Sequence, residues 1–275
     1  MSVMKVDVEK CSRDGICIEI CPLRLLSADG EGRPQMRPGA AAHCIGCGHC
    51  VAVCPRGALD NAKNPLCDQG AIPDKYVPDV GQSLLFLRSR RSIRRYKKEA
   101  VPREKVVELL EIARFAPSGH NTQGISYLVV DSAANLSQLR ELIAGWMKEA
   151  VESSPELSAY LNLPALIEAH ERGEDLVLRD APVLIVAHAP AALLPAQIST
   201  ALALEYVELF APSLGLGTCW AGIAQRCAQA APAFSRFLAI PEDRKITGML
   251  MAGYPKYNHR RLPTRNPLDV AWFSE

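Results

Sequence analysis

The sequence predicts an α+β protein with two domains, a small cysteine-rich one at the N-terminus followed by a larger one of helices and strands. Three observations support this prediction. Seven of the ten cysteines lie between Cys11 and Cys54 in a chain of 275 residues. The composition changes near residue 65, and the segments beyond it show the periodicities of helices and strands. A chain of this length has room for two modest domains.

The composition is that of a globular protein with a sizeable core. Hydrophobic residues make up 48% of the chain and charged residues 22%, which excludes disorder, collagen-like structure and long coiled coils for most of it. Lysine and arginine number 31 against 30 acidic residues, a net charge of +1. This balance argues against a protein built mainly to bind nucleic acid or anionic lipid, and we expect neither nucleic acid nor a membrane as a partner.

The sequence predicts neither a membrane span nor a secretory signal. Its most apolar stretch, residues 181–196, is too short for a bilayer and is interrupted by His188, Pro190 and Pro195. The first ten residues contain charges and no apolar region, which favours a cytoplasmic protein over a secreted, disulfide-bonded one. Cytosolic cysteines at this density usually hold metal.

The small domain is expected over residues 1–63. This segment has little helical periodicity but seven cysteines and two Cys-Pro pairs, typical of a fold stapled by metal. Residues 64–81 contain three prolines and no apolar period, so they are expected to form a linker. The larger domain is expected over residues 82–275.

The larger domain should alternate helices and strands. The apolar strand at 182–189 should be central in a sheet because both its faces are apolar. The helix at 198–217 has few polar positions beyond Glu205 and Glu208, so it should be buried in a core or a subunit interface, with Gly215 and Gly217 as helix caps. The patterns predict helices at 83–92, 101–116, 136–151 and 198–217, and strands at 125–131, 182–189 and 245–255.

The strongest motif is C-x2-C-x2-C-x3-C-P. It comprises Cys44, Cys47, Cys50 and Cys54 followed by proline. In bacterial ferredoxins three thiolates of such a run hold one 4Fe–4S cluster and the fourth reaches a second cluster. Zinc is the alternative metal, but four-cysteine zinc sites pair two knuckles across a longer gap.

An earlier run repeats this pattern from Cys11 to Pro22, with Asp14 in place of the second cysteine. The region therefore resembles a two-cluster bacterial ferredoxin domain. A carboxylate is a weaker ligand for iron than a thiolate, so the second site could hold a 4Fe–4S cluster, a 3Fe–4S cluster or none, and we favour an occupied site. The resemblance assigns Cys21, Cys44, Cys47 and Cys50 to the complete cluster, and Cys11, Asp14, Cys17 and Cys54 to the other.

The remaining cysteines, Cys67, Cys219 and Cys227, fit neither run. Most free cysteines are inert and buried, so we expect no redox role for these three. His43 and His49 flank cluster cysteines and are expected to be loop residues near the cluster rather than ligands.

Seven basic residues lie between Arg88 and Lys98. Alone, such a run indicates a solvated face or a nucleic-acid patch. Four segments together, however, resemble the nitroreductase family of FMN enzymes: R-S-R-R-S-I-R-R-Y from Arg88, A-P-S-G-H-N-T-Q from Ala116, L-G-L-G-T-C-W-A-G from Leu214 and R-R-L-P ending at Pro263. The resemblance covers residues 82–275. It implies an α/β/α sandwich with a mixed, mainly antiparallel sheet, and a homodimer with FMN at the subunit interface.

The family resemblance also implies which residues bind FMN. Arginine and serine side chains suit a phosphate dianion, and Arg94 is expected near the N1 and O2 edge of the flavin, where a cation stabilises the reduced ring. In the family, the loop after Ala116 reaches the flavin held mainly by the other subunit. Chemistry occurs at FMN N5, so no catalytic side chain is expected. The implied residues are Arg90, Arg91, Ser92, Arg94, Pro117, Ser118, Asn121, Gln123, Gly222, Ile223 and Arg261.

Together the two resemblances predict an FMN- and iron–sulfur-dependent oxidoreductase. It would pass electrons from ferredoxin or NAD(P)H through the clusters to FMN, and on to a nitroaromatic, a quinone or an activated alkene. The alternative is an electron carrier or redox sensor that turns over no small molecule. A third possibility is a dehydrogenase or dehalogenase on the same scaffold.

Overall fold

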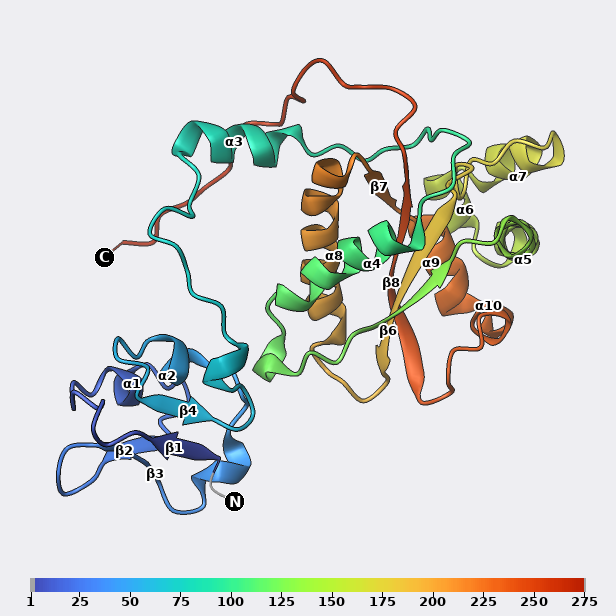
Figure 1. The fold of residues 1–275 in the computed structure, drawn as a ribbon. Coiled ribbons are helices and arrows are strands. Elements are labelled where there is room, and N and C mark those ends of the chain that lie inside the picture. The colour runs from blue at the N-terminus through green and yellow to red at the C-terminus, as the bar shows by residue number, and fades with distance from the viewer. Residues whose placement is uncertain (1–2, 275) are drawn as a thin grey trace. The chain divides into compact units, whose positions relative to one another are not determined.

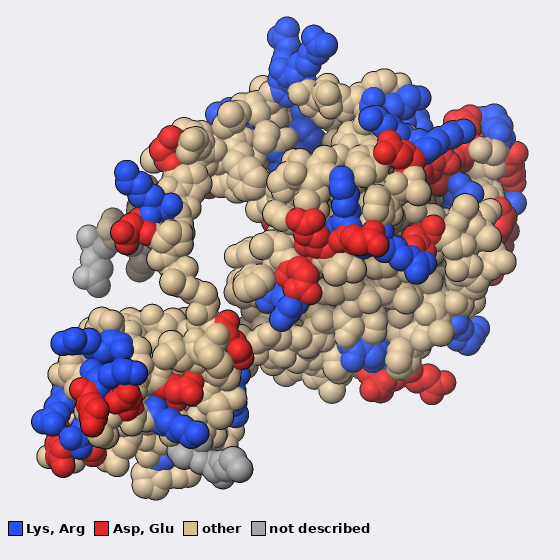
Figure 2. Space-filling model, viewed as in Figure 1, with Lys and Arg blue, Asp and Glu red and all other residues tan. Residues whose placement is uncertain are grey.

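The computed structural model describes residues 3–274, and they form two compact units (Figure 1). The first unit runs to Val77 and includes His120–Thr122; the second comprises Pro78–Gly119 and the chain from Gln123 onward. Acidic and basic side chains are interspersed over the visible face of each unit (Figure 2). Among the helices of residues 3–274, none combines the length and the apolar character needed to cross a bilayer.

The first unit contains two small antiparallel sheets. Strand β1 (Met4–Val6) pairs with β4 (Leu59–Asn61), and β2 (Leu26–Ala28) pairs with β3 (Pro34–Met36). One-turn helices lie at α1 (Ile16–Glu19) and α2 (His49–Ala52), and 3-10 turns at η1 (Ala40–His43) and η2 (Leu66–Asp68).

Helices α1 and α2 begin in the same way. Each follows a glycine in the left-handed conformation, Gly15 and Gly48, with φ of 74° at both. Only glycine adopts this conformation at little cost. Each helix then carries a cysteine, Cys17 or Cys50, as its second residue. The internal repeat seen in the cysteine spacing is therefore also a repeat of backbone geometry.

The core of the first unit is small. Its buried members are Met4, Cys17, Leu26, Val51 and Leu59, and the partly buried thiols of other cysteines pack against them. So few apolar side chains contribute little burial energy, and domains of this size usually depend on a metal or a disulfide. All ten cysteines of the chain are free thiols here.

The second unit is built on a four-stranded antiparallel sheet in the order β5-β6-β8-β7. The strands are β5 (Ser126–Val130), β6 (Val183–Pro190), β8 (Arg244–Gly253) and β7 (Gly217–Trp220). The predicted central position of the strand at 182–189 is confirmed, because β6 lies between β5 and β8 and its first five residues are buried.

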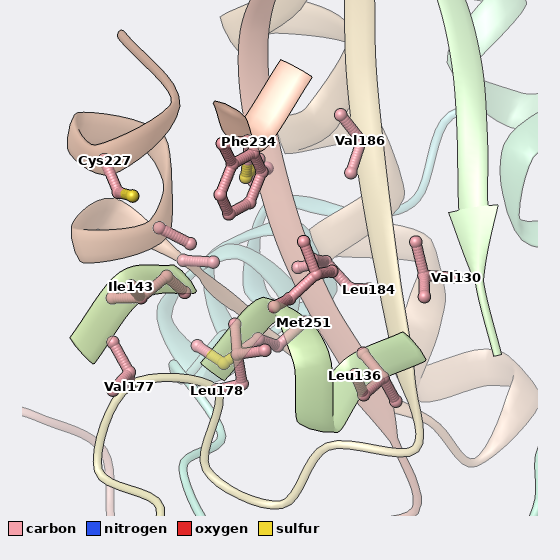
Figure 3. Packing of buried hydrophobic residues seen from close by; sticks show 14 of the residues in the cluster. Val130, Leu136, Ile143, Val177, Leu178, Leu184, Val186, Cys227, Phe234 and Met251 are labelled. Atoms are coloured by element: carbon pink, nitrogen blue, oxygen red, sulfur yellow. The ribbon is translucent and has the colours of Figure 1, made fainter. Parts of the chain in front are cut away.

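Helices cover both faces of this sheet (Figure 1). On one face lie α4 (Arg103–Glu111) and α8 (Ala196–Phe210), packed in a core with Leu250. On the other lie α5 (Ala133–Ser153), α9 (Gly222–Ala230) and α10 (Pro232–Phe237). Figure 3 shows part of this second core, where Ile143, Cys227 and Phe234 pack with Leu184 and Met251 of the sheet. Short segments complete the unit: η3 (Ile112–Phe115), η4 (Gly119–Asn121, shared with the first unit), α6 (Pro155–Leu161), α7 (Leu163–Glu171) and η5 (Ala211–Leu214).

Of the two glycines after α8 that were predicted to be helix caps, one is a cap. Gly215 has φ of 73° and caps η5, as predicted. Gly217 is not a cap but the first residue of β7, where a Cβ would come within 2.9 Å of Ile93 Cβ and of Pro255 Cγ. A glycine is needed at position 217 because the basic segment packs closely against β7 at this point. The predicted single helix at 198–217 is thus α8, η5 and the start of a strand.

Two segments of the second unit expose apolar side chains. Helix α3 (Val80–Ser89) begins with a capping box between Asp79 and Gln82, inside the segment 64–81 predicted as a linker, and buries none of its residues. Leu84, Leu85, Phe86 and Leu87 are each more than half exposed, and so are Trp272 and Phe273 of the C-terminal tail.

Candidate functional site

Four thiols of the first unit line one cavity. Cys21, Cys44, Cys47 and Cys50 line it together with apolar side chains from β1, β2 and β3 and with His49. Burial raises the pKa of the Cys50 thiol, and the nearby Cys47, Cys21 and Cys44 add to this effect. The structure thus brings together the four residues predicted for the complete cluster.

Hydrogen-bond donors point at two of these sulfurs. The backbone N–H of Leu25 donates to Cys21 Sγ over 3.4 Å, and Asn61 Nδ2 donates to Cys44 Sγ over 3.7 Å. Such donors stabilise negative charge on sulfur and tune a metal site. Asn61 is 3% exposed, and sequence reasoning missed it because only the folding of β4 places it beside Cys44.

The residues predicted to hold the second cluster also lie close to one another. Burial raises the pKa of Cys17 to about 11, with smaller increases from Asp14, Cys54 and Cys11. Asp14 accepts hydrogen bonds from Ser12 Oγ at 2.7 Å and from the Ile16 N–H at 3.1 Å, which hold its pKa below the usual range. Within residues 3–274, no three His, Cys, Asp or Glu side chains form a group able to hold a single metal ion.

In the second unit the basic segment lines a pocket. Arg90 and Arg91 face it together with Gly217 and Thr218 of β7 and with residues 257–259 of the tail. Backbone hydrogen bonds fix the segment, since the Ile93 N–H donates to Thr218 O at 2.8 Å and the Lys97 N–H to Tyr254 O at 2.9 Å. His259 lines the pocket, whereas Arg261 lies further along the exposed tail.

Glu208 lies beside this pocket, and sequence reasoning gave it no role. Its side chain is 3% exposed and accepts hydrogen bonds from Trp220 Nε1 at 2.9 Å and Thr218 Oγ1 at 3.4 Å. Arg90 Nη1 lies 3.5 Å from it. Burial raises the pKa of Glu208, and Arg90 opposes that rise. The feature of the sequence that could have pointed to Glu208 is a carboxylate in a largely apolar helix.

A second group of cations gathers around Cys219. The Ser92 side chain hydrogen-bonds this thiol, and the guanidiniums of Arg94 and Arg179 counter the rise that burial causes in its pKa. Burial and the nearby Arg94 lower the pKa of Arg179, which has a left-handed backbone with φ of 62°. Arg179 had no motif to reveal it, because it follows helix α7 in an irregular loop.

The predicted Gly222 and Ile223 lie at the start of α9. No atom lies within 4 Å of the place a Cβ would occupy on Gly222, so the backbone there is open to a ligand. Ile223 is partly buried against the core. The indole of Trp220, two residues before Gly222, turns inward to Glu208 instead.

The loop after Ala116 lines a different pocket. Pro117, Ser118 and Gln123 face it with Ser199 of α8, and the Gln123 N–H donates to Ser118 Oγ at 3.0 Å. His120, Asn121 and Gln123 all have positive φ, 53°, 54° and 48°, a strained geometry of the kind that concentrates at functional sites. Asn121 belongs to the first unit, where its Nδ2 donates to Ile45 O at 3.0 Å.

Five of the eleven predicted FMN residues line these two pockets of one chain: Arg90 and Arg91 line one, and Pro117, Ser118 and Gln123 line the other. Helix α8 contributes Glu208 to the pocket of the basic segment and Ser199 to the pocket of the loop. Nine helical residues span about 13.5 Å, so the two pockets are separate.

Comparison with known proteins agrees with this architecture. The model of the nitroreductase family matches residues 87–254, and that of a 4Fe–4S dicluster domain matches residues 3–55. An NADH dehydrogenase of Thermus thermophilus is 30% identical over 192 residues, covering 63% of this chain and 88% of the relative. An iodotyrosine deiodinase of Thermotoga neapolitana is 26% identical over 189 residues, covering 67% and 94%.

A solved structure has the same fold as the second unit. The nitroreductase with bound FMN from Bacteroides fragilis superposes with a TM-score of 0.55 at 24% identity, covering 69% of this chain and 98% of that one. The antiparallel sheet with helices on both faces is thus the fold implied by the motifs. The chain belongs to the nitroreductase family, as an enzyme whose family domain follows a 4Fe–4S dicluster domain.

Proposed function

We propose that this protein is an FMN- and iron–sulfur-dependent oxidoreductase. Electrons would enter from ferredoxin or NAD(P)H, pass through the clusters to FMN and reduce a nitroaromatic, a quinone or an activated alkene. The observation that carries the proposal is a cavity lined by four thiols in a chain whose other unit is a nitroreductase domain. The resemblance to an NADH dehydrogenase favours NAD(P)H among the donors.

The thiols fit iron–sulfur clusters. Cys21, Cys44, Cys47 and Cys50 would hold a 4Fe–4S cluster, since they surround one cavity and two of them accept hydrogen bonds through sulfur. A second cluster, 4Fe–4S or 3Fe–4S, would be held by Cys11, Asp14, Cys17 and Cys54. A bound cluster supplies one-electron transfer. The small core of the first unit is consistent with a fold that a bound cluster stabilises.

The second unit fits FMN. Arg90, Arg91, Ser92 and Arg261 would bind the phosphate and ribityl chain, and Arg94 would neutralise the N1 and O2 edge. Gly222 and Ile223 would present backbone beside N5, where the open space around Gly222 leaves room for the ring. When bound, FMN accepts and donates hydride. The arginines fix its position and provide fixed positive charge.

We further propose a homodimer with FMN at its interface. On α8, Ile198, Leu202 and Tyr206 are spaced by four residues and are 70%, 39% and 38% exposed, so they form one uncovered apolar face. Five of the eleven predicted FMN residues line two separate pockets in one chain. A second copy would bring the loop pocket of one subunit to the basic pocket of the other.

Anaerobic purification followed by stopped-flow reoxidation tests the proposal. We expect FMN and iron to copurify, and the reduced protein to be reoxidised rapidly by a nitroaromatic or quinone with steady turnover. Reoxidation by protein partners alone would favour an electron carrier. If neither FMN nor iron copurifies or can be reconstituted, the proposed function is wrong.

A second candidate reaction is reductive removal of a halogen from an aromatic substrate. The observation that favours it is the 26% identity to an iodotyrosine deiodinase across most of that relative's length. Halide release from a halogenated phenol by the reduced protein would distinguish this reaction from nitro or quinone reduction.

A further inference from the structure

We propose that Glu208 is a positioning residue that holds Arg90 and Trp220 in place and so links the phosphate-binding segment to the segment beside the reacting edge of the flavin. The inference rests on the FMN site proposed above. It concerns a residue that no motif includes and that contacts both segments directly.

Glu208 is well placed to orient Arg90. Arg90 Nη1 lies 3.5 Å from Glu208 Oε1, and Arg90 Nε lies 3.5 Å from Glu205 Oε1, one turn earlier on α8. The guanidinium is therefore bracketed by two carboxylates. It has five N–H donors, so these contacts leave donors for a phosphate. Glu208 itself would repel a phosphate dianion, so it acts through Arg90 rather than as a ligand.

The same carboxylate also holds Trp220. The indole N–H donates to Glu208 Oε2 at 2.9 Å, and Thr218 Oγ1, two residues earlier on β7, lies 3.4 Å from Oε1. Gly248 leaves room for α8 and for the indole, since a Cβ there would lie 2.8 Å from Thr200 Cγ2 and from Leu204 Cδ1, and 3.3 Å from Trp220 Cζ3. Trp220 is the last residue of β7 and precedes Gly222 by two residues. The indole that Glu208 holds therefore lies at the end of the strand that leads to the open backbone at the start of α9.

Charge and hydrogen bonding at Glu208 can be separated by substitution. Glu208→Gln keeps a carbonyl oxygen that can accept from the indole N–H but removes the charge that holds Arg90. Glu208→Ala removes both and leaves the indole N–H without its partner. Glu205→Gln is the matched control, because Glu205 also contacts Arg90 but its side chain is 47% exposed and accepts no hydrogen bond from Trp220.

The test is the affinity of the full-length protein for FMN, measured by fluorescence titration after the flavin is removed. Because truncating one partner of a buried charge pair is costly, Glu208→Gln should weaken FMN binding by about tenfold, and Glu205→Gln by less than about threefold. In an Arg90→Met background, Glu208→Gln should add no further loss. The midpoint potential of bound FMN should shift more in Glu208→Ala than in Glu208→Gln, because both variants lose the charge but only Glu208→Ala loses the acceptor for the Trp220 indole N–H.

Several outcomes would overturn the inference. Equal effects of Glu208→Gln and Glu205→Gln, or additive effects of Glu208→Gln and Arg90→Met, would show that Glu208 does not act through Arg90. If Glu208→Ala does not fold, Glu208→Gln and its combination with Arg90→Met still test whether Glu208 acts through Arg90. The indole N–H resonance of Trp220 in Glu208→Gln then tests whether Glu208 holds the indole. If the unaltered protein binds no FMN, the proposed function fails, whatever Glu208 does.

Discussion

Asp14 is the residue at which the two halves of the first unit differ most in chemistry. The repeat places a cysteine at the matching position, Cys47, in an otherwise similar geometry. The Asp14 carboxylate is exposed and is held by Ser12 and the Ile16 N–H. A hard oxygen ligand binds an iron atom less tightly than a thiolate does. One iron at this site should therefore be the most easily lost in the molecule.

Asp14→Cys should make the iron at this site harder to lose. Four thiolates would then surround the second site, so the EPR signal of the oxidised protein should lose any 3Fe–4S component and gain four-iron character on reduction. Ser12→Cys is the control, because it adds a thiol outside the ligand spacing. Identical spectra from the two variants would contradict the ligand role of Asp14.

The three cysteines outside the cluster runs should differ in reactivity. Burial raises the pKa of Cys227 to about 12, so only about one thiol in ten thousand is ionised at pH 8. Cys219 is also buried, whereas Cys67 is exposed. Asp68 raises the pKa of Cys67 and so lowers its thiolate fraction at a given pH.

Alkylation followed by mass spectrometry measures this difference. In the folded protein at pH 8, Cys67 should be labelled while Cys219 and Cys227 stay unlabelled until the chain is unfolded. Asp68→Asn should speed the labelling of Cys67 several-fold, because it removes the neighbouring charge. Labelling of Cys227 at the rate of Cys67 would mean that the α9 face of the core opens readily.

Helix α8 shows what its sequence could and could not predict. Its apolar composition predicted burial in a core or an interface, and one side of it does pack against the sheet with Leu204 and Val207. The opposite side carries the uncovered stripe of Ile198, Leu202 and Tyr206. Periodicity alone could not separate the two faces, because apolar residues lie on both sides of the helix.

Ile198→Arg should disrupt the proposed dimer. A charge introduced in the middle of an apolar interface would have to be buried without a partner, which costs enough to favour the monomer. Light scattering after size-exclusion chromatography should give the mass of one chain, and FMN binding should weaken at least about tenfold with it. Tyr160→Arg on α6, also highly exposed, is the control and should leave the mass unchanged.

The other elements could be predicted where the signal lies within a short stretch of the sequence, and not where it depends on distant residues. The predicted strands β5, β6 and β8 and the helices α4 and α5 are confirmed, since apolar periodicity and Pro102 at a helix start are local features. Strand β7 was missed because four residues, Gly217–Trp220, are too few to show a period. Among functional residues, Glu208, Asn61 and Arg179 were missed because their roles depend on neighbours distant in sequence.

At the scale of the whole molecule, the two proposed chemistries lie mostly in separate units. The cysteines proposed as cluster ligands belong to the first unit and the arginines proposed to bind FMN belong to the second, whereas Asn121, also predicted to bind FMN, belongs to the first. Each unit has a core of its own, so a change at one site should be felt little at the other.

Cys47→Ser tests this independence. It removes a thiolate from the cavity of the complete cluster, so iron per chain should fall by about half, while FMN per chain should stay the same. Iron analysis and flavin absorbance measure the two quantities on one sample. Cys67→Ser should change neither. Loss of FMN together with iron would mean that the flavin site depends on the first unit.

Residues 70–79, which join the units, are all exposed and contain no helix or strand. On the proposed electron route, each flavin would meet its own cluster domain at a local concentration in the millimolar range, however dilute the protein. Transfer between them should therefore be first order, with a rate per chain that does not change on dilution, and free ferredoxin at micromolar levels should compete poorly for the same flavin.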